Sequence, residues 1–262
     1  MNAVDISQRD GIVTILLNRP KAKNAINFEV SEAIANVMND VETNPDIRAI
    51  VVGSAVDGVF SAGADLVEAS QNRPSYDMDG PNAAWGLAGL TAKTPRVPVI
   101  AAVDGLAMGG GFEIALAADI LVASDAAIFA LPEVKVGLMA GAGGAVRLPG
   151  QLPQKIAMDM LLTGRPMHAD EAHRLGLISR LVDAGSALET AQEVAATISK
   201  NAPLGVAGSK ATLLNLQNGV EQAHVARWER NATEFAFVMA SADAQEGTTA
   251  FAEKRVPAWS GR

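Results

Sequence analysis

A lone carboxylate, Glu113, follows a run of three glycines in the apolar segment 105–119, GLAMGGGFEIALAAD. An isolated carboxylate among apolar side chains is costly to ionise, so its pKa rises on burial and the group becomes suited to proton transfer. Charge compensation at the positive end of a helix is the simpler structural explanation for an acidic residue in a first turn. The position of Glu113 beside exposed backbone amides favours a catalytic role.

The glycines before Glu113 expose backbone N–H groups. The first amides of a helix have no intrahelical partner, and they carry partial positive charge. Because Gly109, Gly110 and Gly111 have no side chains, a negatively charged oxygen can approach these amides closely. Close packing of the helix on a strand would explain the same glycines without any function, so the glycines alone do not identify a binding site for an oxygen atom.

A second turn of the same design lies in residues 59–66, VFSAGADL, where Gly63 and Ala64 follow a strand-like segment and lead into a helix. Two such turns at strand ends can direct two amides at one oxygen atom, which makes an oxyanion hole from backbone alone. Each donor in such a hole typically stabilises a transition state by about 3–4 kcal/mol.

Glu133 is the second candidate carboxylate, in the segment 129–137, FALPEVKVG. A surface turn is the alternative explanation for this residue, because Pro-Glu is an ordinary turn sequence. Two carboxylates beside one oxyanion hole suit a definite reaction: the bound carbonyl acidifies its α-carbon, one carboxylate deprotonates a water, and the other exchanges a proton with that carbon. The sequence therefore indicates addition or elimination of water across a double bond conjugated to a carbonyl.

The composition is typical of a globular protein and limits its partners. Of the 262 residues 49% are hydrophobic, the formal net charge is −8, and no Lys/Arg cluster forms a basic stripe, so we expect no nucleic-acid partner. The absence of cysteine excludes disulfides, thiolate metal sites and a cysteine nucleophile. No segment predicts a signal peptide or a membrane span, so we expect a cytoplasmic protein without a membrane partner.

Two other signals are weaker. The segment 141–146, GAGGAV, departs from a dinucleotide-binding fingerprint at its sixth position, Val146, and no strong strand precedes it. The three histidines lack the spacing to carboxylates on one helix face that a metal site needs, so we expect no metal.

The elements that must position the candidate residues alternate along the chain. Strands that are apolar on both faces and alternate with helices indicate a parallel sheet covered by helices, which is an α/β fold. The segment 27–44 predicts an amphipathic helix, and the segment 71–95 predicts a surface loop. The predicted strands lie within 11–20, 47–54, 59–66, 97–105, 119–124, 127–133 and 177–182.

Beyond residue 150 the chain becomes mainly helical. We place a boundary near Asn201, between an α/β core of residues 1–201 that carries the site and a helical C-terminal region of residues 202–262. The last helices carry much apolar surface, which an oligomer interface would bury. The helices predicted after residue 150 lie within 154–164, 169–177, 186–201, 204–217 and 219–239.

An ordered series of motifs resembles the enoyl-CoA hydratase/isomerase (crotonase) family along nearly the whole chain. The resemblance implies a crotonase-type spiral of repeated ββα units with a C-terminal helical trimerisation region, a homotrimer or a dimer of trimers, and an acyl-CoA thioester substrate. Coenzyme A is then part of the substrate, and no separate cofactor is expected. The motifs are NRPKAKNAIN, FSAGADL, PVIAAVDGLAMGGGFEIALAADILVAS, FALPEVKVGL, GAGGAVRLP, LTGRPMHADEAHRLGLISRLV and FAEKRVPAW.

The resemblance assigns a role to individual positions. It places the two oxyanion amides on Ala64 and Gly110. It makes Glu113 the residue that holds the water and Glu133 the residue that delivers the α-proton. The implied substrate and CoA cradle, in which Phe251 and Lys254 come from a neighbouring subunit, comprises Lys21, Ala22, Ala62, Ala64, Asp65, Leu66, Gly110, Gly141, Phe251 and Lys254.

The presence of both glutamates favours reversible hydration of trans-2-enoyl-CoA to 3-hydroxyacyl-CoA, a reaction of fatty acid metabolism. Ala140 stands where hydratases of the family often have proline, and the GGGFE and FAEKR features resemble the family's carnitinyl-CoA dehydratases, so elimination of that type is an alternative. Isomerisation of Δ3- to Δ2-enoyl-CoA, which needs one base, is another. A non-catalytic CoA-binding subunit is the alternative from a different class, and it would need neither glutamate.

Overall fold

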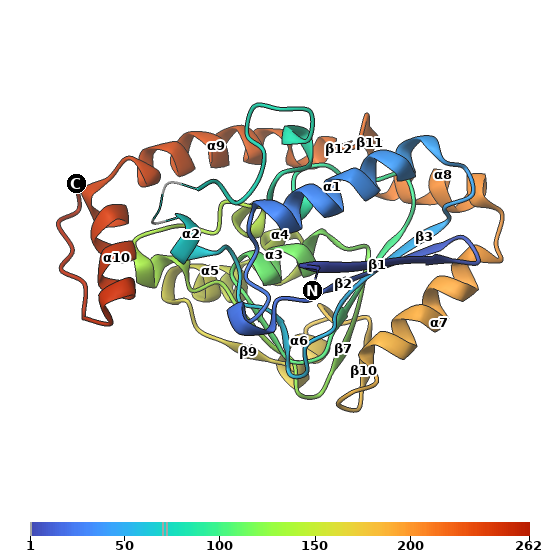
Figure 1. The fold of residues 1–262 in the computed structure, drawn as a ribbon, viewed down its shortest axis with the longest axis horizontal. Helices are drawn as coiled ribbons and strands as arrows, with labels where there is room; N and C mark the ends of the chain where they lie inside the picture. Colours follow the sequence, from blue (N-terminus) through green and yellow to red (C-terminus); the bar gives the residue numbers. More distant parts are fainter. Residues whose placement is uncertain (1, 70, 72) are drawn as a thin grey trace.

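The chain forms two mostly parallel sheets with helices packed around them (Figure 1), and between residues 49 and 130 its strands enter the two sheets alternately. The computed structural model describes residues 2–69, 71 and 73–262. The larger sheet has the order β1-β2-β3-β5-β7-β10, and the smaller sheet has the order β4-β6-β8-β9. The pairings of β1 with β2 and of β8 with β9 are antiparallel, and the others in these two sheets are parallel.

The strands of the larger sheet are β1 (Val4–Arg9), β2 (Ile12–Leu17), β3 (Ala49–Ser54), β5 (Val99–Val103), β7 (Ile120–Ser124) and β10 (Arg180–Val182). Those of the smaller sheet are β4 (Val59–Ser61), β6 (Leu106–Met108), β8 (Ile128–Ala130) and β9 (Met167–His168). A separate hairpin pairs β11 (Leu216–Gln217) with β12 (Val220–Glu221).

Successive units of two strands and a helix wind as a spiral. In each unit the chain passes through the larger sheet, then the smaller sheet, then a helix: β3-β4-α2 is followed by β5-β6-α3 and by β7-β8-η4. Because β4, β6 and β8 are parallel neighbours, the turns that follow them lie at the same edge of the smaller sheet. This arrangement confirms the predicted spiral of ββα units, and it brings the two predicted turns side by side.

The helices before residue 152 are α1 (Phe28–Thr43), α2 (Leu66–Ala69), α3 (Gly110–Ala117) and α4 (Gly144–Gln151). The later helices are α5 (Gln154–Thr163), α6 (Ala169–Arg174), α7 (Ala187–Ser199), α8 (Pro203–Leu214), α9 (Val225–Met239) and α10 (Ala242–Glu253). Short 3-10 turns form η1 (Pro20–Ala22), η2 (Ala83–Trp85), η3 (Leu87–Gly89), η4 (Glu133–Val136) and η5 (Gln222–His224).

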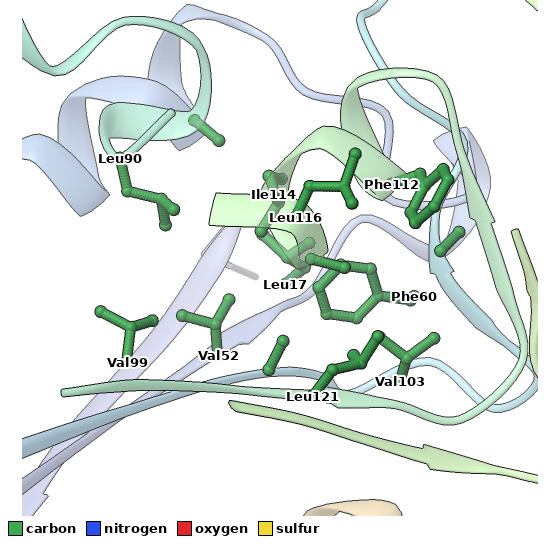
Figure 2. Close-up of a cluster of buried hydrophobic side chains, with 14 of the residues drawn as sticks. Leu17, Val52, Phe60, Leu90, Val99, Val103, Phe112, Ile114, Leu116 and Leu121 are labelled. Carbon is green, nitrogen blue, oxygen red and sulfur yellow. The ribbon is translucent and has the colours of Figure 1, made fainter. Parts of the chain in front are cut away.

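The central strands are buried on both faces, as their continuous apolar runs predict. One face of the larger sheet packs against α7 through small side chains such as Ala102 and Ala191. Figure 2 shows the other face, where side chains including Val52 and Val103 lie opposite α3. Glu113 therefore lies on a helix that is held against the core, because Phe112 and Ile114 on either side of it are fully buried.

Several elements were not predicted. The strand β1 buries one of its six residues, so its apolar signal is weak, and β6 is a three-residue strand within a segment that reads as a turn. The predicted helix 219–239 begins only at Val225, because Gly219, with φ +78°, forms the turn of the β11-β12 hairpin. The helix α10 was also missed.

Among the described residues, no helix is both long enough and apolar enough to cross a membrane.

Candidate active site

The two glycine turns are in contact. A Cβ atom placed on Gly63, whose φ is +96°, would lie 2.8 Å from the carbonyl oxygen of Met108 and 3.0 Å from the nitrogen of Gly110. Conversely, a Cβ atom placed on Gly110 would lie 3.3 Å from the nitrogen of Ala64. The turns approach this closely because their residues have no side chains at the contact, which brings together the two amides predicted from separate motifs.

The amides of Ala64 and Gly110 are free to donate. Within residues 2–69, 71 and 73–262, the recorded hydrogen bonds include none donated by either N–H group. The turn around Ala64 is nevertheless fixed, because the N–H of Ile26 donates to the Gly63 carbonyl at 2.7 Å and the N–H of Asp65 donates to the Ile26 carbonyl at 2.9 Å. Gly110 is the first residue of α3, where an N–H has no partner within the helix.

Glu113 lies in the first turn of α3 and is only 3% exposed. Its Oε1 accepts a hydrogen bond from the N–H of Gly144 at 2.8 Å. Burial raises the pKa of Glu113 from the ordinary 4.5 to about 7, although the amides of Gly144 and Ala142 and the charge of Arg147 favour its ionised form. A carboxylate with this pKa can gain or lose a proton near neutral pH.

Glu133 is the first residue of η4, and its carboxyl group points towards the glycine turn of α3. A Cβ atom placed on Gly109 would lie 3.0 Å from Oε1 of Glu133. Burial and, to a smaller extent, the negative charge of Glu113 raise the pKa of Glu133 to about 8, so the two carboxyl groups share one electrostatic environment. A pair of this kind holds one proton near neutral pH.

Replacement of Glu133 by glutamine is expected to stabilise the fold at alkaline pH. The pKa of this carboxyl is raised on folding to about 8, so the free energy of unfolding falls as the pH rises from about 4.5 to about 8. Glutamine cannot ionise and avoids this loss. We expect Tm of the variant to exceed that of the wild type at about pH 8.5, by ~2–4 °C for each kcal/mol gained, and the difference to shrink near pH 5.

Thermal melts at the two pH values measure this effect. Glu193→Gln on the exposed side of α7 is the matched control, and its Tm should differ from the wild type equally at both pH values. A Glu133→Gln variant that melts no higher than the wild type at alkaline pH contradicts the burial of this carboxyl group.

The turn 141–144 joins η4 to α4 and lies against both the site and the C-terminal helices. A Cβ atom placed on Gly144 would lie 3.1 Å from Oε1 of Glu113, so glycine is needed where the amide meets the carboxylate. Gly141, a predicted substrate contact, lies against the ring of Phe235 on α9. The structure thus brings Ala64, Gly110, Glu113 and Glu133 into one site, and the contact of Gly141 with substrate stays a prediction.

The predicted CoA contacts near the N-terminus form a second, adjacent group. Lys21 and Ala22 lie in η1, and the N–H of Ala62 donates to the carbonyl of Lys23 at 3.0 Å. Ala62, Asp65 and Leu66 follow β4, next to the Ala64 turn. Whether these residues contact CoA stays a prediction.

Asp65 has a structural task in addition to any contact with CoA. Its carboxylate is paired with Arg19 at 2.9 Å and accepts a hydrogen bond from the N–H of Glu68 at 3.1 Å. It therefore ties the segment before η1 to the start of α2. The Arg19 guanidinium is engaged in this pair.

Phe251 and Lys254 lie at the C-terminal end of α10. Phe251 is 56% exposed, and Lys254 is the left-handed residue that ends the helix. Helix α10 contacts η4 and α9 of its own chain. The assignment of Phe251 and Lys254 to the CoA site of a neighbouring subunit stays a prediction.

Sequence reasoning missed two side chains near Glu113. Arg147 on α4 is 3% exposed, donates to the carbonyl of Thr91 at 2.7 Å and lies over the ring of Trp228. Tyr76, the single tyrosine of the chain, packs against the core, and its pKa is raised by burial and by the charge of Glu113. A lone arginine in the otherwise apolar AVRLP and a lone tyrosine in a polar loop were the available signals.

The spiral of ββα units, with two free amides beside a pair of buried carboxyl groups, defines a crotonase-type protein. The chain belongs to the enoyl-CoA hydratase/isomerase family, whose model matches residues 7–262. It is 40% identical over 263 residues to carnitinyl-CoA dehydratase of Proteus mirabilis (strain HI4320), with 99% of each chain covered. The resemblance inferred from the motifs is thereby confirmed.

Solved structures agree with this assignment. Carnitinyl-CoA hydratase from Mycobacterium avium superposes with a TM-score of 0.95 at 42% identity, and 100% of each chain is covered. Enoyl-CoA hydratase from Mycobacterium tuberculosis H37Rv superposes with a TM-score of 0.76 at 38% identity, also over 100% of each chain.

Proposed function

We propose that this protein catalyses the reversible addition of water to the double bond of a trans-2-enoyl-CoA, which gives a 3-hydroxyacyl-CoA. The observation that carries the proposal is the pair of buried glutamates, Glu113 and Glu133, next to two amides without acceptors. Membership of the enoyl-CoA hydratase/isomerase family supports the proposal.

In this mechanism the thioester oxygen accepts hydrogen bonds from the N–H groups of Ala64 and Gly110. Negative charge develops on that oxygen as the enolate forms, so two preorganised donors stabilise the transition state more than the ground state. Gly110 adds the partial positive charge at the start of α3.

The two carboxyl groups divide the proton transfers. Ionised Glu113 takes a proton from the water whose oxygen bonds to the β-carbon, and protonated Glu133 delivers its proton to the α-carbon. The higher pKa of Glu133, about 8 against about 7 for Glu113, favours this distribution of the single proton. In the reverse direction Glu133 removes the α-proton, and Glu113 protonates the departing hydroxyl.

Hydration is expected to follow a bell-shaped pH profile with its maximum between about pH 7 and about pH 8. Glu113 must be ionised, so kcat/KM falls as the pH drops below the Glu113 pKa of about 7. Glu133 must be protonated, so kcat/KM falls again as the pH rises above the Glu133 pKa of about 8. Measurement of kcat/KM from about pH 5 to about pH 10 resolves both limbs. A flat profile above pH 6 contradicts the shared proton.

Dehydration of carnitinyl-CoA is a second candidate function. The observation that favours it is the name of the relative from Proteus mirabilis, which is similar to this chain over its whole length. The chemistry at the α- and β-carbons is the same in the two reactions, so Glu113 and Glu133 keep their roles. The two substrates differ only in the acyl chain, which in carnitinyl-CoA carries a group with a permanent positive charge.

The CoA cradle and the assembly belong to the same proposal. Lys21, Ala22 and the segment 62–66 hold the CoA moiety, and Phe251 and Lys254 of a neighbouring subunit complete the cradle. Large exposed apolar side chains on the C-terminal helices support a homotrimer or a dimer of trimers; they are Leu204, Leu213, Phe237, Met239 and Phe251. We place the enzyme in the cytoplasm, acting in lipid metabolism without a further cofactor.

A panel of acyl-CoA substrates tests the function. Crotonyl-CoA, a longer 2-enoyl-CoA, a 3-enoyl-CoA and crotonobetainyl-CoA are each incubated with the protein, and the products are identified by mass spectrometry and chromatography. We expect a 3-hydroxyacyl-CoA from at least one of them, and the preferred substrate decides between the two candidates. Conversion of a 3-enoyl-CoA without any hydroxyacyl product would identify an isomerase, and tight CoA binding with no turnover would identify a binding subunit.

A further inference from the structure

Helix α9 (Figure 1) contacts both the turn 141–144 and α4, the helix that follows this turn and packs against α3. Asn231, which is 8% exposed, donates through Nδ2 to the carbonyl oxygen of Gly141 at 2.8 Å. Arg227, one helical turn earlier, donates to the carbonyl of Val146 at 3.3 Å. The ring of Phe235, one turn later, lies against Gly141. One face of α9 therefore contacts Gly141 of the turn and the first turn of α4.

The same turn also binds the carboxylate of Glu113 through its backbone amides. The N–H of Gly144 donates to Oε1 of Glu113 at 2.8 Å, and the amide of Ala142 also favours the ionised carboxylate. Residues 141–143 of the turn lie outside regular secondary structure, and Gly143 has a φ of +120°. Its position therefore depends on the groups that hold it from outside.

We propose that Asn231 is a positioning residue for Glu113: it fixes the carbonyl of Gly141 and thereby aims the amides of the turn at the carboxylate. Asn231 does not touch the reacting atoms. The inference rests on the proposed function, because it assigns to Glu113 the activation of water.

The unpaired oxygen of Asn231 supports a functional reason for the residue. Its Oδ1 is buried and has no recorded hydrogen-bond partner among the described residues. A buried acceptor without a partner costs stability, typically about 1–3 kcal/mol. A small apolar residue would avoid this cost, so the contact with Gly141 is the benefit that the amide brings.

The charged groups around Glu113 determine what a change at Asn231 can do to its pKa. The titratable groups recorded against Glu113 are Glu133 on η4, Arg147 on α4 and Tyr76 in the loop after α2. None of them is bonded to Asn231 in the described part of the chain. A change at Asn231 therefore reaches Glu113 through the backbone of the turn.

Replacement of Asn231 by alanine or by leucine, which has a similar size but no hydrogen-bond donor and no charge, tests the proposal. We expect kcat for hydration of the enoyl-CoA to fall about 10- to 100-fold, while KM for the enoyl-CoA changes less than about twofold. Misplacement of a catalytic group affects the chemical step more than substrate binding. The acidic limb of the pH profile should move to higher pH, since Glu113 loses amides that favour its ionised form. Arg230→Ala, whose side chain is 77% exposed on the same helix, should behave as the wild type.

The possible results separate a positioning role of Asn231 from a purely structural one, and they separate both from failure of the proposed function. If folded Asn231→Ala and Asn231→Leu keep the wild-type kcat and acidic limb, the positioning role is wrong, even where Tm falls. If one variant fails to fold, as circular dichroism and Tm reveal, the other provides the measurement, and loss of folding in both overturns the role in favour of a purely structural one. If the wild type itself hydrates no enoyl-CoA, the proposed function fails.

Discussion

Glu133→Gln and Glu113→Gln are each expected to reduce kcat for enoyl-CoA hydration by about 10³-fold, because a positioned acid or base contributes ~10²–10⁴-fold. Glutamine keeps the size of the side chain and cannot exchange a proton. The Kd for CoA should stay within about twofold of the wild type, since neither carboxyl group belongs to the CoA cradle. Steady-state hydration and CoA titration measure the two quantities.

The roles of the two glutamates can be separated by isotope exchange. A saturated acyl-CoA in D2O should exchange its α-proton when Glu133 is present, because Glu133 is the group that faces the α-carbon. We expect Glu113→Gln to retain a larger share of this exchange than Glu133→Gln. Equal exchange in both variants would reject the assignment, and wild-type hydration in either variant would reject the paired mechanism.

Gly110→Pro is expected to reduce kcat by about 10²–10³-fold, because it removes one of the two oxyanion donors. Proline is tolerated at the first position of a helix, which is the position of Gly110 in α3. The added atoms meet the Leu87 side chain, whose Cδ2 lies 2.6 Å from the Cβ position of residue 110. We therefore make the substitution in a Leu87→Ala background.

Gly110→Ala in the same background is the matched control. It places a Cβ atom at the same point and keeps the N–H group. The difference in kcat between the proline and alanine variants then reports the hydrogen bond rather than the added bulk. If the two variants have the same kcat, the Gly110 amide does not stabilise the transition state.

The parts of the site that could be predicted are those encoded within short segments. The two glycine turns, Glu113 and Glu133 each follow a strand, and parallel strands bring the segments after them to one edge. The strand β6 was missed, yet the turn at Gly109 and Gly110 was recognised, because its local sequence carries the signal. The parallel α/β arrangement follows from the order of the elements, whereas the spiral was implied by the family resemblance.

The parts that could not be predicted depend on contacts between distant segments. Asn231 meets Gly141 across 90 positions, and Arg147 meets the carbonyl of Thr91 across 56. Nothing in the local sequence of α9 indicates that one of its polar residues is buried. The pair of Asp65 with Arg19 was likewise not predicted. The contact of Asp65 with substrate, which the family resemblance implies, stays a prediction.

The C-terminal helices acquire a second role in this account. They were expected to serve oligomerisation, which stays a prediction along with the boundary near Asn201. In the structure α9 contacts the turn that holds Glu113, and α10 contacts η4, which begins with Glu133. Gly247 of α10 lies against the carbonyl of Val136 so closely that a side chain there would clash. The segments that hold Glu113 and Glu133 are therefore both in contact with the C-terminal helices.

A crystal structure of the protein with a bound 3-oxoacyl-CoA, which has no hydroxyl group to eliminate, would show whether the two amides bind the thioester oxygen between them. We predict that the thioester oxygen lies about 2.7–3.1 Å from the nitrogens of both Ala64 and Gly110. The carboxyl groups of Glu113 and Glu133 should flank the α- and β-carbons. A thioester oxygen beyond hydrogen-bond reach of either amide, or Glu133 turned away from the α-carbon, would contradict the account.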